Sequence, residues 1–353
     1  MCVSPLATLT ETCSSLFVET AIPLGTVAPD YEEHPMSENR FPYPAFPMGW
    51  FQVAYSDEIG PGGVKPLKYF GKDLVLFRTE AGKAVVLDAF CPHLGAHLGY
   101  GGKVSGDSIV CPFHAWEYDC TGQCTKVPYG TRKPKAARIR PWDLREVNGL
   151  IMVWHHPEGE APLWEIPEVE EYASDEWTEY SVRRWKIRTR NQEMAENTVD
   201  TQHFHYVHGA SNHPTAEFST DGHILYSSLN PEMQTPMGPV EGKVQIEAYG
   251  FGFTVTRFLG LAETLLVNSV TPIDEEYVDA RFSFTVKKIG GGDVTRGIGA
   301  AFIREIERQV EQDKPIWENK AYVRPPILSD EDGPIMRYRR WAAQFYTDPV
   351  GVA

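Results

Sequence analysis

Two short segments, each with one cysteine and one histidine, constrain this chain more than any other feature. They are Cys91-Pro92-His93 and, after seventeen intervening residues, Cys111-Pro112-Phe113-His114. Thiolate and imidazole groups are strong ligands for transition metals. Each pair stands on a short segment punctuated by proline or glycine. The spacing therefore predicts one metal site that is shared by two loops.

A Cys-x-His pair followed by a Cys-x-x-His pair is the ligand set of a Rieske [2Fe–2S] centre. The two cysteines hold one iron and the two histidines hold the other, which raises the reduction potential above that of an all-cysteine cluster. Zinc also accepts two cysteines and two histidines, but its finger motifs pair like residues with like. Because each pair here is mixed, an electron-relaying cluster is favoured over zinc or no metal.

Composition limits the remaining classes of function. At 353 residues the chain is long enough for two domains, and with 42% hydrophobic residues it is globular. A net charge of −15 argues against nucleic acid as a partner. No apolar run is as long as a membrane span, and the N-terminus lacks the features of a signal peptide. With six cysteines, two of them assigned to iron, we expect a cytoplasmic protein.

One basic stretch departs from the acidic average. Residues 121–142 contain no acidic residue but six basic ones, Lys126, Arg132, Lys133, Lys135, Arg138 and Arg140. Such a run is often only a solvated loop. It could equally dock an acidic electron donor, a ferredoxin or a ferredoxin reductase, beside the cluster. The sequence leaves both interpretations open.

The pattern of elements predicts an α+β chain. Residues 1–40 are expected to form an extended arm. Residues 41–158 are expected to form an all-β domain that carries the cluster, with strands over 64–70, 73–78, 84–89 and 150–154. A Pro- and Glu-rich linker over 156–172 leads into a second domain over 159–353. There we expect a helix over 192–208, strands over 244–248, 251–258, 264–270 and 278–286, and a long helix over 296–320.

The first of these helices suggests a second iron site. Non-haem Fe(II) oxygenases use two histidines and one carboxylate and leave positions open for oxygen. His203 and His208 are candidates, although their spacing aligns them only if the helix ends at His208, with Gly209 as a left-handed cap. Asp200 precedes His203 by three residues and is expected to accept a proton from its ring. Asn197 is a further candidate catalytic residue. Ordinary packing is the alternative for such a histidine-rich run.

The missing carboxylate is expected on the long C-terminal helix. Ile306, Val310, Asp313 and Trp317 follow helical spacing, so Asp313 stands within an apolar stripe. A carboxylate in that position is costly unless it is paired or bound to metal. Asp313 is therefore the predicted third ligand.

With both motifs in view, the chain resembles the α subunit of Rieske non-haem iron oxygenases from Phe41 to Tyr346. It is most similar to the steroid-oxidising branch, which includes bacterial 3-ketosteroid 9α-hydroxylases and cholesterol 7-desaturases. The resemblance is carried by Cys91–His97, Cys111–Trp116, Val127–Tyr129, Asp200–His208, Glu311–Trp317 and the segment from Asp332 to Tyr346.

The resemblance implies a helix-grip (START-like) catalytic domain with a curved antiparallel sheet, and head-to-tail homotrimers. It also implies that electrons from NADH pass through a separate reductase to the cluster of one subunit and then to the mononuclear iron of the next. Asp200 would bridge a cluster histidine of one chain and His203 of its neighbour, which is compatible with orienting His203. The protein would then be the terminal oxygenase of a steroid monooxygenase.

The sequence is also compatible with other reactions. The chemistry could be sterol desaturation or demethylation, or oxygenation of another hydrophobic or aromatic substrate. A non-enzymatic alternative is a pure electron-transfer protein, but this interpretation leaves the inward carboxylate of Asp313 unexplained. Large apolar residues between the two motifs are candidates to line a substrate pocket, among them Phe218, Tyr226, Met233, Met237, Tyr249, Phe251, Phe253, Phe258, Leu265 and Leu266.

Overall fold

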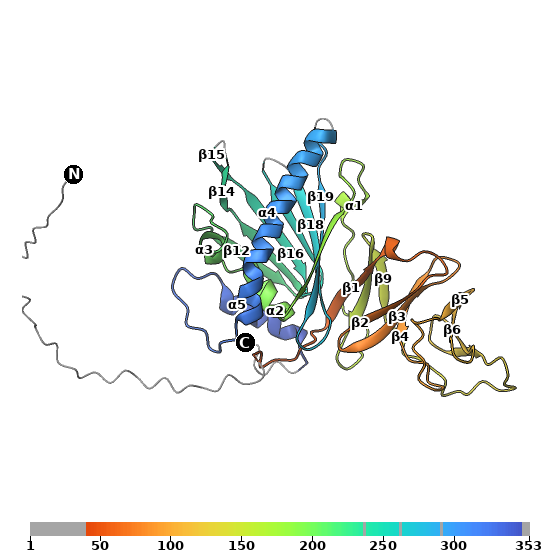
Figure 1. Cartoon of the computed structure of the whole chain (residues 1–353). Coiled ribbons are helices and arrows are strands. Elements are labelled where there is room, and N and C mark those ends of the chain that lie inside the picture. Colours follow the sequence, from red (N-terminus) through yellow and green to blue (C-terminus); the bar gives the residue numbers. More distant parts are fainter. Residues whose placement is uncertain (1–39, 236–237, 261–262, 290–291, 348–353) are drawn as a thin grey trace, which may run out of the picture. The chain divides into compact units, whose positions relative to one another are not determined.

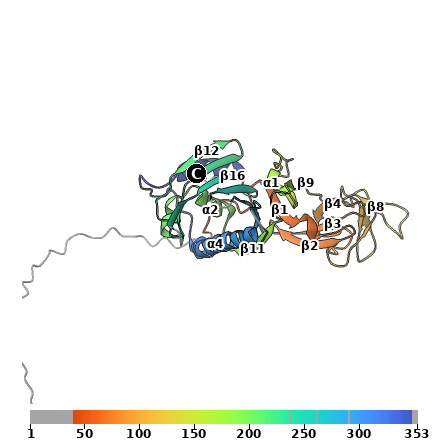
Figure 2. The same ribbon diagram turned by 90° about the horizontal axis from the view of Figure 1, so that it is seen from above.

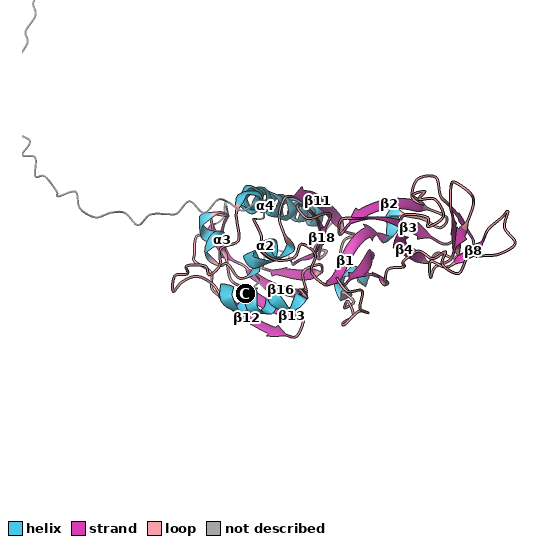
Figure 3. Ribbon diagram, turned by 90° about the horizontal axis from the view of Figure 1, so that it is seen from below, coloured by secondary structure: helices cyan, strands magenta, loops and turns pink. Residues whose placement is uncertain are grey.

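The computed structural model describes residues 40–235, 238–260, 263–289 and 292–347. The predicted N-terminal arm therefore lies outside the described residues, apart from Arg40. The N-terminal region, residues 40–155, consists almost entirely of strands and loops (Figure 3). The C-terminal region, residues 156–347, combines a large antiparallel sheet with helices (Figure 1).

Three small antiparallel sheets form the N-terminal region. The first is β1 (Gly49–Tyr55), β10 (Leu150–His155) and β9 (Leu144–Val147), and the second is β2 (Val64–Tyr69), β3 (Lys72–Arg78) and β4 (Ala84–Asp88). The third is β5 (Lys103–Ser105), β6 (Ser108–Val110), β7 (Glu117–Tyr118) and β8 (Cys124–Lys126). A short 3-10 turn, η1 (Ser56–Glu58), follows β1. The four predicted strands fall on β2, β3, β4 and β10, so the all-β prediction is confirmed.

A seven-stranded antiparallel sheet dominates the C-terminal region, with strand order β11-β19-β18-β17-β16-β13-β12. Its members are β11 (Ser181–Ile187), β12 (Ala216–Asp221), β13 (Ile224–Leu229), β16 (Lys243–Tyr249), β17 (Thr254–Leu259), β18 (Thr264–Pro272) and β19 (Val278–Val286). The hairpin of β14 (Glu232–Thr235) and β15 (Gly238–Glu241) stands apart from it. The predicted strands are confirmed, but β17 begins three residues later than expected because Gly250–Phe253 form the turn that precedes it.

The long helix and all the shorter helical segments of this region except α1 lie against one face of this sheet. The long helix α4 (Gly292–Asn319) lies across the strands (Figures 1 and 2), and its apolar residues pack on β18 and β19 in one core cluster. The shorter helical segments are α1 (Glu170–Ala173), α2 (Asn191–Ala195), η2 (Glu196–Thr198), α3 (Gln202–Tyr206), α5 (Ile335–Ala342) and η3 (Ala343–Phe345). The predicted long helix is confirmed, four residues longer at its start, with Pro315 inside it.

The prediction of one continuous helix over 192–208 is wrong. The chain forms α2 and η2, interrupts the helical hydrogen bonds over Val199–Thr201, and starts a new helix only at Gln202. Two contacts explain the break. The Asp200 carboxylate accepts the backbone N–H of His203 at 3.4 Å, a local bond that competes with helix continuation. A Cβ on Gly333 would lie 1.8 Å from the Val199 carbonyl oxygen, so the C-terminal segment packs directly against the break.

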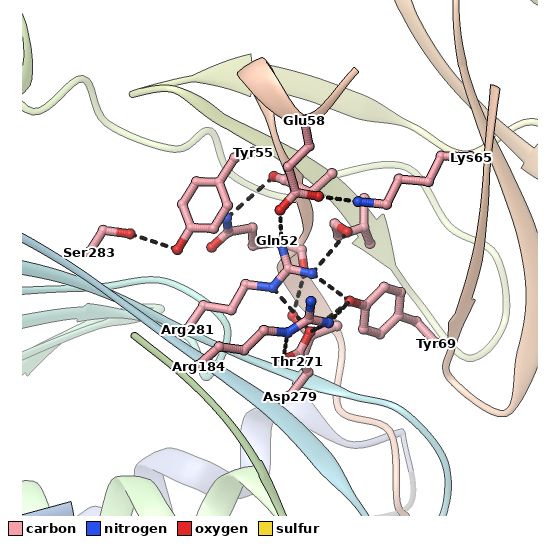
Figure 4. Close-up of polar contacts among 12 residues, drawn as sticks. Gln52, Tyr55, Glu58, Lys65, Tyr69, Arg184, Thr271, Asp279, Arg281 and Ser283 are labelled. Carbon is pink, nitrogen blue, oxygen red and sulfur yellow. Dashed lines mark hydrogen bonds and ion pairs between the residues drawn. The ribbon is translucent and has the colours of Figure 1, made fainter. Parts of the chain in front are cut away.

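Strand β19, which lies second from one edge of the sheet, is buried on both faces. Its alternation predicts one apolar and one polar face, and the apolar residues pack under α4. The polar face is covered by the N-terminal region, where Tyr69 donates to Asp279 at 2.7 Å and Tyr55 contacts Ser283 at 2.9 Å (Figure 4). This polar face therefore forms part of the contact between the two regions.

Asp279 is the centre of that buried contact. Arg184 donates two hydrogen bonds to its carboxylate at 2.6 and 2.7 Å, and Arg281 donates a third at 3.0 Å (Figure 4). Burial by itself raises the pKa of Asp279, but the bond from Arg184, the charge of Arg281 and the bond from Tyr69 together lower it. Arg281 is 1% exposed and also donates to Tyr69 and to the Val53 carbonyl.

Replacing Asp279 by alanine is expected to destabilise the fold by about 3–5 kcal/mol, because the buried Arg281 then keeps only its longer ion pair with Glu58, at 3.7 Å. Urea unfolding of the full chain measures the change. Since folding lowers the Asp279 pKa, its contribution is complete above the unfolded value and is lost as the pH falls through the folded value. Glu275→Ala, on the exposed turn before β19, is the control and should change stability by less than about 0.5 kcal/mol. Equal midpoints for the two variants would contradict the assignment.

Candidate iron sites

The two cysteine-histidine segments form matching turns. Cys91 follows β4, and its carbonyl accepts the N–H of Gly95 at 2.9 Å; Cys111 follows β6, and its carbonyl accepts the N–H of Ala115 at 3.1 Å. Gly95 and Ala115 both have positive φ, at 77° and 56°. A positive φ is unusual for alanine. Both loops therefore turn back at the fourth residue after the cysteine, which brings the intervening ligands toward the same side.

The side chains of these loops converge as a cluster requires. Cys91 and Cys111 are buried, and the rings of His93 and His114 lie 4.8 Å apart. His93 stacks on Trp116 with ring centroids 4.4 Å apart. The buried Nδ1 of His114 has no hydrogen-bond partner among the described residues. Two buried thiols and an unpartnered imidazole nitrogen fit the donor set of a Rieske [2Fe–2S] centre.

The second predicted triad also comes together. His203 stands on α3, His208 follows that helix, and Asp313 projects from α4. One ligand atom from each lies within 4.8 Å of the others, and His208 Nε2 is 3.4 Å from Asp313 Oδ2. Asp313 is 8% exposed within the apolar stripe of α4. The helix ends at Tyr206, before His208, and Gly209 has the expected left-handed conformation at φ 77°. Two imidazole nitrogens and a buried carboxylate fit a mononuclear Fe(II) ion.

The contact between Asp200 and His203 differs from the predicted one. The ring Nδ1 of His203 donates to the backbone carbonyl of Asp200, while the Asp200 carboxylate is 3.9 Å from that nitrogen. The prediction that the carboxylate takes this proton is therefore wrong, because the break in the helix turns the carbonyl toward the ring. Nδ1 keeps its hydrogen and Nε2 is left for a metal. Burial lowers the pKa of His203, which favours the neutral ring that a metal needs. The Asp200 side chain is 43% exposed.

Trp317 and Asn197 form a chain of hydrogen bonds to Asp313, the candidate third ligand. Asn197 Nδ2 donates to Asp313 Oδ2 at 3.3 Å, and Trp317 Nε1 donates to Asn197 Oδ1 at 3.3 Å. The structure thus places Asn197 against a candidate ligand rather than apart from the site. Its amide orients the carboxylate, and the indole in turn orients the amide.

Gln312 is a functional candidate that sequence reasoning missed. Its Oε1 accepts a hydrogen bond from His208 Nδ1 at 3.1 Å, which fixes the proton on Nδ1 and leaves Nε2 facing Asp313. Gln312 precedes Asp313 directly and stands off the apolar stripe, so helical spacing gave no signal for it.

Gln312→Ala is expected to weaken Fe(II) binding about 10- to 100-fold, since outer partners of metal-bound histidines commonly have effects of that size. Competition with an Fe(II) chelator measures the affinity, and the visible absorption of the [2Fe–2S] cluster checks that the other centre is intact. Glu311→Ala, the adjacent exposed position that contacts Trp185, is the matched control. Equal Fe(II) affinity in the two variants would rule out the role of Gln312.

An inner pocket of about 200 Å³ lies between the sheet and the helices and is lined by His203, His208 and Asp313. Most of its wall is apolar. Among its polar lining residues, Thr254 and Asn268 form one row, directly opposite each other across β17 and β18, and Thr256 stands two residues further along β17. Asn191 lines it too, and its buried Oδ1 has no hydrogen-bond partner among the described residues.

Sequence reasoning identified only part of the pocket wall. Of the large apolar residues named as candidates, Phe251, Phe258 and Leu266 line the inner pocket. The side chains of Met233 and Met237 lie outside the described residues. Membership depends on strand register, because only the residues on the helix-facing side of β16, β17 and β18 reach the pocket.

The basic stretch is exposed beside the cluster loops. All six of its basic residues are exposed, and within it Tyr129 accepts a hydrogen bond from Trp116, the residue stacked on His93. Lys126 pairs with Glu117 at 2.7 Å. Exposed apolar side chains, Leu94, Tyr100 and Phe113 among them, stand on the same loops.

Comparison with known proteins gives two family matches. Residues 49–142 match the Rieske [2Fe-2S] domain, and residues 153–346 match the 3-ketosteroid 9alpha-hydroxylase C-terminal domain. In the described part of the chain, no helix combines the length and apolar character needed to cross a membrane.

Relatives and solved structures agree with these matches. The chain is 34% identical over 334 residues to a 3-ketosteroid-9-alpha-monooxygenase oxygenase component of Rhodococcus rhodochrous, covering 87% of this chain and 84% of the relative. It is 32% identical to cholesterol 7-desaturase nvd 1 of Ciona intestinalis, covering 86% and 70%. Among solved structures, NdmA of Pseudomonas putida CBB5 with caffeine has a TM-score of 0.68 at 20% identity, covering 83% of this chain and 89% of that one. The last similarity concerns the fold alone.

Proposed function

The chain belongs to the 3-ketosteroid 9α-hydroxylase family of Rieske monooxygenases and is an oxidoreductase, and from this premise we propose that it is a terminal oxygenase that hydroxylates a 3-ketosteroid-like substrate. The overall reaction takes one C–H bond, O₂, two electrons and two protons to a C–OH bond and water. The observation that carries the proposal is the triad of His203, His208 and Asp313 in the wall of an apolar pocket.

We assign the ligands accordingly. Cys91 and Cys111 hold one iron of the [2Fe–2S] cluster, and His93 and His114 hold the other. His203, His208 and Asp313 hold a mononuclear Fe(II), which supplies oxygen activation when bound. The residues around it do the remaining work. The apolar wall excludes water, Asn197 and Gln312 orient two of the ligands, and the row of Thr254 and Asn268 offers hydrogen bonds to an oxygen substituent of the substrate.

Electron delivery follows the same assignment. The electrons originate from NADH and arrive through a separate reductase or ferredoxin in the cytoplasm, and the exposed basic stretch beside the cluster is the docking surface for that acidic donor. The chain works as a homotrimer in which Asp200 bridges His203 and a cluster histidine of the neighbouring subunit. Its side chain is 43% exposed and forms no hydrogen bond with the ring of its own His203, which supports this role.

A panel of steroids tests the function. The full chain with both metal centres loaded is incubated with a surrogate reductase, NADH and O₂, and products are analysed by mass spectrometry and NMR. Hydroxylation of a 3-ketosteroid adds one oxygen to the product. Substrate-independent electron transfer without any oxidised steroid would refute the proposal and favour an electron carrier.

Sterol desaturation is the second candidate, because the chain is also 32% identical to a cholesterol 7-desaturase. The same panel distinguishes the two reactions. Desaturation removes two hydrogens from a sterol and adds no oxygen, so the product is lighter than the substrate instead of heavier.

A further inference from the structure

A second cavity adjoins the inner pocket. This outer chamber lies between the segment Phe204–Ala210 and the α4 segment Ala301–Gln309, with a volume of about 530 Å³. Six residues line both cavities: Phe204, His208, Val244, Phe258, Ile306 and Gln309. The two cavities therefore share the wall that carries the candidate iron ligand His208.

The outer chamber offers hydrocarbon contacts and few free polar groups. Its charged residues are already engaged, because Glu305 accepts hydrogen bonds from Arg308 at 2.9 Å and from Gln309 at 3.0 Å. Arg308 also donates to the His208 carbonyl at 3.2 Å. The rest of the wall is largely apolar and includes Pro231, Phe258 and Phe302. The ring centroids of Phe258 and Phe302 are 4.8 Å apart. A ligand group in this chamber gains mainly by leaving water.

The inner pocket is too small to hold a large ligand alone. Its volume of about 200 Å³ is below the range of about 300–1,000 Å³ common for ligand sites. Its polar row and the outer chamber lie at opposite ends. Thr254 and Phe258 are four residues apart on β17, which separates them by about 13 Å along the strand. A ligand anchored by oxygen at Thr254 and Asn268 therefore extends past Phe258 toward the outer chamber.

We propose that the outer chamber binds an aliphatic side chain of the substrate. The ring system then occupies the inner pocket beside the iron ligands, with its oxygen substituent at the polar row and its apolar tail in the outer chamber. The chain accordingly prefers steroids that retain a side chain over those that have lost it. This inference rests on the proposed steroid function and specifies its substrate class.

The first test uses the wild-type chain with both metal centres loaded. Steroids with one identical 3-keto ring system and C-17 alkyl chains of increasing length are compared by dissociation constant and by kcat/KM. Each added methylene is expected to strengthen binding about fourfold until the chamber is filled, from the transfer of hydrocarbon out of water. Affinity that does not change with chain length would overturn the inference while leaving the proposed function intact.

The second test fills the chamber. Ala301→Trp places an indole in its wall, and Ala300→Trp, an exposed neighbour on α4 that lines neither cavity, is the matched control. The ratio of kcat/KM for the long-tailed steroid to that for the tail-less steroid is expected to fall at least about tenfold in Ala301→Trp only. An equal loss on both substrates would mean that the chamber is only a passage, which overturns the inference. No oxidation of any steroid, tailed or tail-less, would instead refute the proposed function, and the inference would fall with it.

Discussion

Asp313→Ala is expected to abolish oxygenation and to release the mononuclear iron while the [2Fe–2S] cluster remains. Removing Asp313 leaves His203 and His208 as two neutral ligands, and the buried charge that balances the metal is lost. The loss of Fe(II) affinity should exceed the roughly 10- to 100-fold expected for an outer partner such as Gln312. Iron analysis together with the visible absorption of the cluster separates the two centres.

The control for Asp313→Ala is another carboxylate on the same helix. Glu311→Ala removes an exposed carboxylate two residues away that contacts Trp185, so it should keep both metals and substrate-dependent oxygen uptake. Asp313→Asn keeps the shape and the bond from Asn197 but not the charge, and it should also lose iron. Full iron content and turnover in Asp313→Ala would refute the ligand assignment.

Asp200→Ala is expected to give the opposite pattern, with both metal centres loaded and oxygenation reduced about 100-fold or more, the size of effect seen when reacting partners lose alignment. The structure gives the reason for intact loading. His203 Nδ1 donates to the Asp200 backbone carbonyl, which the substitution retains, and Gly333 still packs against the break at Val199, so the ligand keeps its orientation. What disappears is the exposed carboxylate proposed to link neighbouring subunits.

Stopped-flow oxidation of the reduced cluster in the presence of substrate and O₂ measures this step directly. In Asp200→Ala the cluster should be reduced normally but reoxidised slowly. Glu217→Ala removes an exposed carboxylate on β12 and should leave the rate unchanged. Near-normal turnover by Asp200→Ala would contradict the bridge role, and loss of mononuclear iron would mean that the carboxylate supports the ligand after all.

Hydrophobic periodicity in the sequence predicted the elements that bury one apolar face in the core. The strand over 278–286 and the long helix appeared where hydrophobic periodicity placed them, because their apolar faces pack on each other. Periodicity failed at Val199–Thr201, where the approach of Gly333 and the Asp200 carboxylate interrupt the helix. It also could not show that the polar face of β19 is buried, since Asp279 finds its partners on distant strands.

The sequence by itself determined which atoms are available as ligands. It contains mixed cysteine-histidine pairs, two nearby histidines and one carboxylate within an apolar stripe, and all of these can be recognised without coordinates. Only the tertiary structure decided how these groups face one another. The contacts of Gln312, Asn197 and the Asp200 carbonyl arise where α3, η2 and α4 meet. The two cavities depend on the register of β16, β17 and β18. The physical reason is that a ligand's identity is local, whereas its orientation and the shape of the space beside it depend on segments more than a hundred residues apart.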